Sequence, residues 1–305
     1  MARRRRGVPV NGVLLLDKPK GLSSNHALQR TRRLFQAQKA GHTGTLDPMA
    51  TGLLPVCFGE ATKFSAHLLE ADKVYRTRVE LGAITDSGDA EGDVVERREV
   101  PRLTEADVEG VLEGFCGEID QVPPMYSALK HQGRKLYELA REGKSIERAA
   151  RRVTVYDARL LVLADTAFEL EVRVSKGTYI RTLAEDIGQV LGCGAHISAL
   201  RRLATGPFTS EGMLTLEALE AQADQADREA VLLPVDVLVD HLSRLEIDAV
   251  VASRLTHGQP ARVEAGELAE GETTRLYRDG AFLGLGTVTG PQEVAPKRLL
   301  STAAD

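Results

Sequence analysis

Tryptophan is absent from this sequence of 305 residues, and aromatic residues make up only 4% of it. Cysteine is scarce as well: Cys57, Cys116 and Cys193 lie far apart, are odd in number and fit no zinc spacing. The cysteine pattern excludes a disulfide framework and predicts reduced thiols in a cytoplasmic protein. No apolar run approaches the roughly 18 residues of a membrane span, so we expect no contact with a membrane. Arg3–Arg6 precede neither an apolar segment nor a cleavage site, which argues against a signal peptide.

A large excess of one charge is also missing, because the net charge is only −5. The charges are nevertheless unevenly distributed. Residues 1–63 hold 11 Lys and Arg against 3 Asp and Glu, and residues 130–152 hold 8 against 3, whereas residues 211–248 hold 2 against 10. A polyanion responds to the local field, so the two basic stretches are compatible with RNA binding. Taken alone, such runs are more often plain solvated surfaces.

The apolar fraction of 43% and the charged fraction of 27% are those of an ordinary globular protein. Helical and strand-like patterns alternate irregularly up to residue 240, which favours an α+β domain with a mixed sheet. Residues 244–300 are rich in turns, with a hairpin signal at Asp279-Gly280. We therefore predict two domains, 1–240 and 241–305, the second small and β-rich. Helices are expected at residues 24–35 (after a Ser23 or Ser24 cap), 61–69, 104–115, 135–141 and 180–191, strands at 13–16, 75–81 and twice within 153–174, and a loop at 40–55.

The most unusual segment is Gly41–Pro55, which reads GHTGTLDPMATGLLP. It places a single carboxylate, Asp47, in a loop flanked by glycines and followed by Pro48. Proline restricts Asp47 to extended conformations, and the glycines permit a close approach of the backbone to a ligand. An aspartate held in this way can act as a nucleophile or general base. The plainer alternative is a turn in which Asp47 caps the next segment.

This loop resembles the signature of the TruB-type tRNA pseudouridine-55 synthases. Other parts of the chain resemble further motifs of that family, namely residues 13–24, 73–76, 123–130, 177–183 and 197–202. The resemblance implies a pseudouridine synthase fold, with a mixed, largely antiparallel sheet flanked by helices and a PUA-like RNA-binding domain at the C-terminus. It also implies isomerisation of uridine 55 in the T loop of tRNA. No cofactor is expected, because one carbon–nitrogen bond is exchanged for a carbon–carbon bond. No metal is expected either, because no His, Cys or acidic residue lies at ligand spacing from His42.

On this resemblance, three residues are expected to carry the chemistry. Asp47 becomes the catalytic aspartate. Tyr75, on the apolar face of its strand, is expected to stack on the flipped base, although such a residue is otherwise an ordinary core tyrosine. Arg181 is expected to pair with Asp47 and keep it ionised; the alternative is a surface pair with Glu185 at the i+4 position.

The remaining predicted contacts concern the substrate. His42 is expected to fill the gap that the flipped base leaves in its stack. Residues 123–152 resemble the family's RNA-binding insertion, which closes over the T arm and whose basic side chains would contact phosphates. The predicted substrate-binding residues are His42, Lys63, Tyr179, Leu200, Lys130 and Arg134.

The acidic segment 86–93 resembles a calcium loop in composition only, and we interpret it as a solvated hairpin tip. No obligate protein partner is expected, and a monomer is the default. Two alternative functions are a tRNA-folding chaperone and a guide-dependent RNA pseudouridine synthase, which shares the Asp47 motif.

Overall fold

The computed structural model describes residues 7–263 and 268–301, so the predicted role of Arg3–Arg6 lies outside the described residues. The main element is an eight-stranded sheet with the order β1-β3-β12-β4-β11-β10-β7, and β2 pairs with β3 beside this path. All of its pairings are antiparallel except that of β12 with β3. This confirms the predicted α+β class with a mixed, largely antiparallel sheet. The strands are β1 (Gly12–Lys18), β2 (Ala40–His42), β3 (Thr51–Phe58), β4 (Lys73–Leu81), β7 (Gly117–Gln121), β10 (Arg151–Ala164), β11 (Ala167–Val174) and β12 (Ala195–Thr205).

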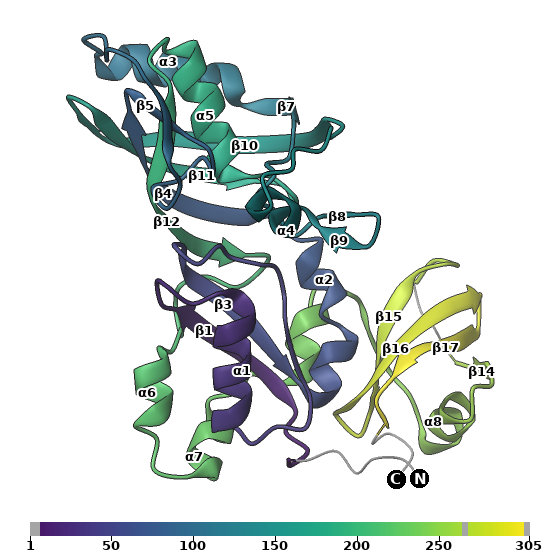
Figure 1. Cartoon of the computed structure of the whole chain (residues 1–305). Helices are drawn as coiled ribbons and strands as arrows, with labels where there is room; N and C mark the ends of the chain where they lie inside the picture. Colours follow the sequence, from purple (N-terminus) through teal and green to yellow (C-terminus); the bar gives the residue numbers. More distant parts are fainter. Residues whose placement is uncertain (1–6, 264–267, 302–305) are drawn as a thin grey trace.

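The sheet is divided into two lobes that share β12 (Figure 1). β12 pairs with β4 along most of its length and reaches β3 only at Arg201 and Arg202. The first lobe holds β1 to β3, and the second holds β4, β7, β10 and β11, so the junction lies where β3 begins. The helices are α1 (Ser24–Leu34), α2 (Ala66–Leu69), α6 (Leu216–Glu220) and α7 (Gln225–Ala230) at the first lobe, and α3 (Glu105–Phe115) and α5 (Ile180–Val190) at the second.

Local sequence explains these elements. Along β4 every second side chain is buried, from Lys73 through Tyr75 to Leu81, which is the period of a strand with one covered face. Ser23 caps α1 by accepting a hydrogen bond from the His26 N–H. Helix α3 begins with a capping box between Thr104 and Asp107. The helices predicted at 24–35, 104–115, 135–141 and 180–191, and the two strands within 153–174, are therefore confirmed to within a few residues.

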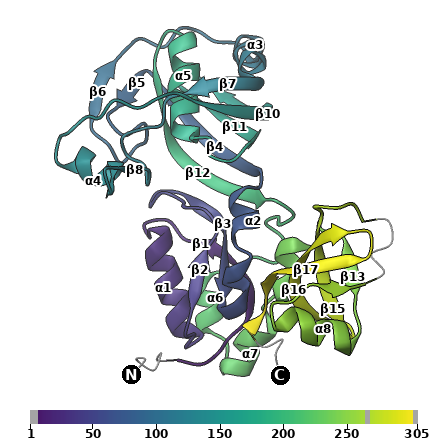
Figure 2. The same cartoon turned by 90° about the vertical axis from the view of Figure 1, so that its right-hand side faces the viewer.

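A separate five-stranded sheet forms the C-terminal part, in the order β13-β15-β16-β17-β14. Asp279 and Gly280 both have positive φ, 52° and 76°, as a two-residue hairpin turn between β15 and β16 requires. Phe282 and Leu285 of β16 share an apolar cluster with Phe64 of the first lobe, so the two parts pack together (Figure 2). The elements are β13 (Arg244–Glu246), α8 (Ala249–Thr256), β14 (Ala261–Arg262), β15 (Thr273–Arg278), β16 (Ala281–Gly290) and β17 (Glu293–Leu299).

Two local predictions are wrong. The loop expected at 40–55 is confined to residues 43–50, because β2 and β3 occupy both ends of that segment. Pro55 and Gly52 disfavour a strand locally, but pairing with β1 on a fully buried surface outweighs that preference. The helix expected at 61–69 is split into a 3₁₀ turn, η1 (Gly59–Lys63), and the short α2.

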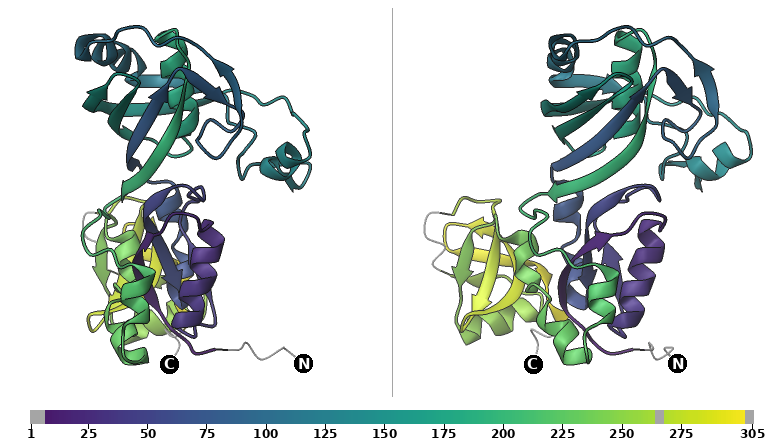
Figure 3. Two further views of the ribbon diagram at one scale, coloured as in Figure 1. Left: turned by 60° about the vertical axis from the view of Figure 1, so that its left-hand side comes forward. Right: turned by 90° about the vertical axis from the view of Figure 1, so that its left-hand side faces the viewer.

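The basic insertion projects from the second lobe (Figure 3). It contains a small hairpin of β8 (Lys130–His131) and β9 (Arg134–Lys135), followed by α4 (Leu136–Arg141). A second small hairpin, β5 (Ala83–Thr85) with β6 (Val94–Arg97), lies between β4 and α3 and carries the acidic segment 86–93. No helix in the described part of the chain is long and apolar enough to cross a membrane.

Candidate active site

A cavity of about 320 Å³ lies at the junction of the two lobes. Its wall is made by three segments that are distant in the sequence: the loop after β2, the segment before β8, and the residues that lead into α5. Strands β4 and β12 complete it. The residues that line it include Gly44, Asp47, Lys73, Tyr75, Ser127, Tyr179, Arg181, Leu200 and Arg202.

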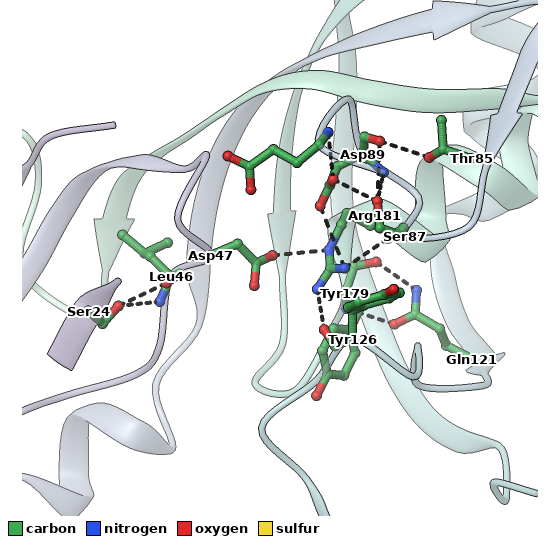
Figure 4. Close-up of polar contacts among 11 residues, drawn as sticks. Ser24, Leu46, Asp47, Thr85, Ser87, Asp89, Gln121, Tyr126, Tyr179 and Arg181 are labelled. Carbon is green, nitrogen blue, oxygen red and sulfur yellow. Dashed lines mark hydrogen bonds and ion pairs between the residues drawn. The ribbon is translucent and has the colours of Figure 1, made fainter. Parts of the chain in front are cut away.

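The loop that carries Asp47 is fixed from both sides. The Ser24 hydroxyl donates to the Leu46 carbonyl at 3.0 Å and accepts from the Leu46 N–H at 2.7 Å. The Pro48 carbonyl accepts from the Gly21 N–H at 2.8 Å, and the buried ammonium of Lys18 lies 3.4 Å from the same oxygen. The residues on either side of Asp47 are thus tied to β1 and α1, which leaves its carboxylate directed toward the second lobe (Figure 4).

Arg181 meets that carboxylate across the junction. Its Nε lies 3.0 Å from Asp47 Oδ2, and its Nη1 lies 3.7 Å from Asp89 Oδ2. Nη1 also donates to the Ser87 carbonyl at 2.8 Å, and Nη2 donates to the Tyr126 carbonyl at 2.7 Å. The predicted pairing of Arg181 with Asp47 is present, and among the described ion pairs the alternative with Glu185 is not. One guanidinium therefore joins the catalytic loop, the acidic segment and the insertion (Figure 4).

The acidic segment 86–93 forms a hairpin tip, as predicted, but it is only partly solvated, because residues 87–89 are buried while Asp86, Glu91 and Asp93 are exposed. Asp89 is buried and Ser87 nearly so, and the Ser87 hydroxyl donates to Asp89 Oδ1 at 2.7 Å. The segment is drawn inward because the Ala90 N–H donates to the Ile197 carbonyl and the Ile197 N–H donates to the Gly88 carbonyl. A second carboxylate, that of Asp89, therefore contacts Arg181. The sequence showed only the single carboxylate of the Asp47 loop.

The electrostatics of Asp47 combine burial with ion pairing. The Asp47 side chain is 33% exposed, and it lies in the wall of the cavity. Protein atoms surround it on its other sides. Burial raises the pKa of the Asp47 carboxyl above its ordinary value, the Arg181 guanidinium opposes this shift, and the like charge of Asp89 adds to it. Arg181 is therefore the group that most favours the ionised form of Asp47, ahead of Lys18. An ionised carboxylate that is one-third open to a cavity can attack an electrophilic carbon or accept a proton.

Tyr75 and Leu200 both line the cavity. In the register of β4 with β12, Tyr75 lies opposite Arg202 and Thr77 lies opposite Leu200, so these side chains share one face of the sheet. Tyr75 is 9% exposed and Leu200 is 7% exposed. An aromatic ring and an aliphatic side chain on one face of a cavity can pack against a planar base that enters it.

Tyr179 is positioned by its backbone. Its N–H donates to Gln121 Oε1 at 2.7 Å, and its carbonyl accepts from Gln121 Nε2 at 3.0 Å. This pair fixes the residue that immediately precedes α5 against the end of β7. Burial raises the pKa of the Tyr179 phenol, and the neighbouring Ser127 hydroxyl opposes the shift. Gln121 was missed from the sequence, because a lone glutamine carries no local signal.

The other predicted contacts are dispersed. His42 lies in β2 outside the cavity wall, and burial and nearby Arg202 lower the pKa of its imidazole. Lys63 does not line the cavity: its ammonium pairs with Glu60 at 2.7 Å and donates to the Leu299 carbonyl at 2.9 Å. It therefore joins η1 to the C-terminal sheet. Lys130 and Arg134 are exposed on the insertion hairpin, and Arg134 pairs with Glu142.

Two basic residues of the wall were not singled out from the sequence. The guanidinium of Arg202 donates to the Leu53 carbonyl at 2.7 Å and to the Gly44 carbonyl at 3.3 Å, so it clamps both ends of the catalytic loop. Lys73 is buried, and burial lowers its pKa to about 8. Both residues lie within the motif segments 73–76 and 197–202. The motifs do not show, however, whether such a residue holds the protein backbone or binds the substrate. No cluster of three or more metal-ligating side chains occurs within residues 7–263 and 268–301.

Glu185, one turn after Arg181 on α5, makes stability depend on pH. Burial and the neighbouring Asp186 raise its pKa to about 7. A carboxyl in the unfolded chain ionises near pH 4.3, so the folded state holds this proton more tightly. The contribution of Glu185 to the free energy of unfolding is therefore fully present below about pH 4.3. It decreases as the pH rises toward about 7 and decreases no further above pH 7. We expect Glu185→Gln to remove most of this loss when urea unfolding is compared at pH 5 and pH 7.5. Glu109→Gln, at an exposed position of α3, is the control, and an unchanged pH dependence in Glu185→Gln would refute the assignment.

Comparison with known proteins agrees with this geometry. Three family models match the chain: TruB family pseudouridylate synthase (N terminal domain) at residues 32–180, tRNA pseudouridylate synthase B C-terminal domain at 181–240, and Pseudouridine synthase II TruB, C-terminal, at 243–300. The chain is 68% identical over 304 residues to tRNA pseudouridine synthase B of Chromohalobacter salexigens, covering 100% of this chain and 99% of that protein. It is 53% identical over 311 residues to the protein of the same name from Burkholderia mallei, with 100% of both covered.

Solved structures give the same result. The structure of a Cbf5-Nop10-Gar1 complex contains a similar chain, with a TM-score of 0.72 and 26% identity, covering 98% of this chain and 91% of that one. An H/ACA RNP bound to a substrate RNA containing 2′-deoxyuridine matches with a TM-score of 0.71 and 25% identity, and with the same coverage. The predicted pseudouridine synthase fold with a β-rich, PUA-like C-terminal part is thereby confirmed. The chain belongs to the TruB family of pseudouridylate synthases and is an isomerase.

Proposed function

We propose that this enzyme converts uridine 55 in the T loop of tRNA to pseudouridine, with Asp47 as its nucleophile. The observation that carries the proposal is the ion pair of Asp47 with Arg181, 3.0 Å apart, in a cavity walled by Tyr75 and Leu200. The shared name of the relatives, tRNA pseudouridine synthase B, supports tRNA as the substrate. The resemblance of the Gly41–Pro55 loop to the pseudouridine-55 synthase signature supports the position.

The chemistry needs one ionised carboxylate in a closed site. The bond between N1 of the uracil and C1′ of the ribose breaks, the base turns, and C1′ joins C5, which gives up its proton while N1 gains one. Asp47 can add to the uracil ring or to C1′, and both routes require the carboxylate rather than the acid. The base must leave its stack to enter the cavity, and this costs a few kcal/mol that contacts with Tyr75 and Leu200 can offset.

The direct test is to incubate the purified protein with an unmodified tRNA transcript and map pseudouridine at single-nucleotide resolution. No guide RNA and no other protein are added. One new pseudouridine at position 55 is the expected result. Tight tRNA binding without product would favour a folding chaperone. Product that appears only with a guide RNA would favour the guide-dependent type.

Tyr75 provides a prediction that separates stacking from ordinary core packing. Tyr75→Leu should lower kcat/KM by roughly 5-fold to 100-fold, because base–aromatic stacking contributes about 1–3 kcal/mol. Tyr75→Phe keeps the ring and should retain most of that binding. Phe168→Leu on β11 is the matched control, since Phe168 is buried in the same sheet but does not line the cavity. It should lower the melting temperature without this loss of activity. Equal losses in Tyr75→Leu and Phe168→Leu would favour the core interpretation.

Lys130 and Arg134 provide a prediction about RNA affinity. Each contact with a phosphate contributes a slope of about −0.7 to −0.9 to the dependence of log affinity on log salt. We expect Lys130→Ala to reduce the slope by about one such contact, and Arg134→Ala to have a smaller effect because Arg134 pairs with Glu142. Glu142→Gln frees that arginine and should strengthen binding at low salt. Binding is measured by titration at several salt concentrations, and unchanged slopes in all three variants would contradict the RNA contact.

A further inference from the structure

Arg202 lies at the point where β12 passes from one lobe to the other. Its backbone is opposite Tyr75 of β4 in the second lobe, and it also pairs with β3 of the first lobe. Its side chain reaches the loop that carries Asp47. There Nε donates to the Leu53 carbonyl at 2.7 Å, and Nη2 donates to the Gly44 carbonyl at 3.3 Å. One residue therefore connects a strand of the cavity wall with both sides of the catalytic loop.

The two glycines on either side of Asp47 both face Arg202. Gly44 and Gly52 have positive φ, 93° and 97°. A Cβ at Gly52 would lie 2.3 Å from the Arg202 carbonyl oxygen, which is far too close for nonbonded atoms. A Cβ at Gly44 would lie 3.4 Å from Arg202 Nη1. The close approach that these glycines permit is thus to Arg202, whereas the sequence predicts an approach to a ligand.

The charge of Arg202 is unfavourable for the stability of the fold. The residue is only 1% exposed, and its guanidinium pairs with no carboxylate of the residues that the structure describes. Other cations lie nearby: burial lowers the pKa of Lys18 and of Lys73, and the positive charge of Arg202 lowers both further. A buried cation without a partner of opposite charge costs free energy that an apolar side chain would not. Stability alone therefore does not account for an arginine at this position.

We propose that Arg202 is a positioning residue that holds the Asp47 loop in its reactive conformation relative to Tyr75. The proposal rests on the proposed function, in which Asp47 reacts with a nucleotide whose base packs against Tyr75. The two carbonyls that the guanidinium binds lie before and after Asp47 in the chain, and the backbone of the same arginine is fixed beside Tyr75. Arg202 thus sets the distance between the carboxylate and the base. A displacement of about 1 Å between reacting groups can lower a rate by about 10²-fold.

The first test separates positioning from substrate binding and from overall stability. Arg202→Met keeps an unbranched side chain in the wall and removes both hydrogen bonds. We expect it to lower kcat on unmodified tRNA by about 10²-fold, with KM within a few-fold of the wild type. Arg201→Met is the matched control, because Arg201 bonds to Asp17 of β1 at 2.7 and 3.0 Å but does not line the cavity. Its kcat should stay within a few-fold of the wild type.

Stability is compared in the same two variants. The melting temperature should fall at least as much in Arg201→Met as in Arg202→Met, because Arg201 loses an ion pair whereas Arg202 has none to lose. An unchanged kcat in Arg202→Met, or an equal loss of kcat in Arg201→Met, overturns the proposal.

The second test separates geometry from charge. Arg202→Lys keeps the positive charge but lacks the planar fork, so it should recover little of the lost kcat. The acidic limb of the pH–rate profile should stay in place in Arg202→Met, because the charges that shift the pKa of Asp47 belong to other residues. Full activity in Arg202→Lys, or an acidic limb that moves to higher pH in Arg202→Met, would mean that Arg202 acts through its charge and would overturn the proposal.

Hydrogen exchange shows where the loss of Arg202 acts. In Arg202→Met the amides of residues 43–50 should exchange faster than in the wild type, while those of β4 and α5 keep their wild-type rates. Equally faster exchange throughout β4 and β12 would make Arg202 a general brace of the sheet and overturn the proposal. Wild-type protein without activity on tRNA would instead contradict the proposed function itself, and the exchange result does not depend on that activity.

Discussion

Asp47→Asn is expected to abolish pseudouridine formation, with a loss of about 10⁴-fold or more, since removing a nucleophile leaves only the contribution of binding. The amide has the shape of the carboxylate but cannot attack carbon or hold a negative charge. Arg181 keeps Asp89 and two carbonyls as partners, so the site should not collapse. The change therefore isolates the chemistry of one group.

Binding is the control measurement for this variant. The affinity for tRNA should stay within a few-fold of the wild type, because most of the RNA contacts are expected on the insertion and the C-terminal part. Asp157→Asn, at an exposed position of β10, should change neither rate nor affinity. If Asp47→Asn retained turnover, Asp47 would not be the nucleophile. A large loss of affinity would mean that its carboxylate also organises the RNA site.

Much of this site could be predicted because its chemistry is concentrated in short segments. The Asp47 loop carries its own glycines and proline, Tyr75 lies on a strand with a clear period of two, and Arg181 begins an amphipathic helix. The pairing of Asp47 with Arg181 could be expected once the family resemblance was recognised. In the folded chain all three residues line one cavity.

Other parts could not be predicted, because they depend on contacts between distant segments. Asp89 lies in a polar, glycine-containing segment that looks solvated, and only the bridge to Ile197 of β12 draws it inward. Lys63 donates a hydrogen bond to the Leu299 carbonyl of the C-terminal sheet. The helical pattern around Lys63 could not predict this contact, because Leu299 is distant in the sequence. The strand β3 was missed because glycine and proline suggest a loop, whereas burial between neighbouring elements decides the outcome.

Arg181→Lys is expected to have the second largest effect, a loss of about 10²-fold to 10³-fold in kcat with a small change in KM, because a lysine cannot reproduce the planar fork. Arg181 bonds to two carboxylates and two carbonyls at once, and a single ammonium on a shorter reach cannot satisfy all four. Asp47 would then lose the 3.0 Å contact with the guanidinium, and the positive charge of the lysine would not lie at the same position. Since burial already raises the pKa of Asp47, this loss should raise it further, and the acidic limb of the pH–rate profile should move to higher pH.

The pH profile distinguishes this role from a purely structural one. Asp89→Asn leaves the ion pair of Arg181 with Asp47 in place. It removes the negative charge of Asp89, and in the wild type that charge raises the pKa of Asp47. Its acidic limb should therefore stay or move to lower pH, opposite to that of Arg181→Lys, and its rate should fall less. If both variants lost activity equally, with unshifted profiles and lower melting temperatures, Arg181 would only brace the junction of the lobes. Opposite shifts would mean that the guanidinium sets the ionisation of the reacting carboxylate, which the 3.0 Å contact between them predicts.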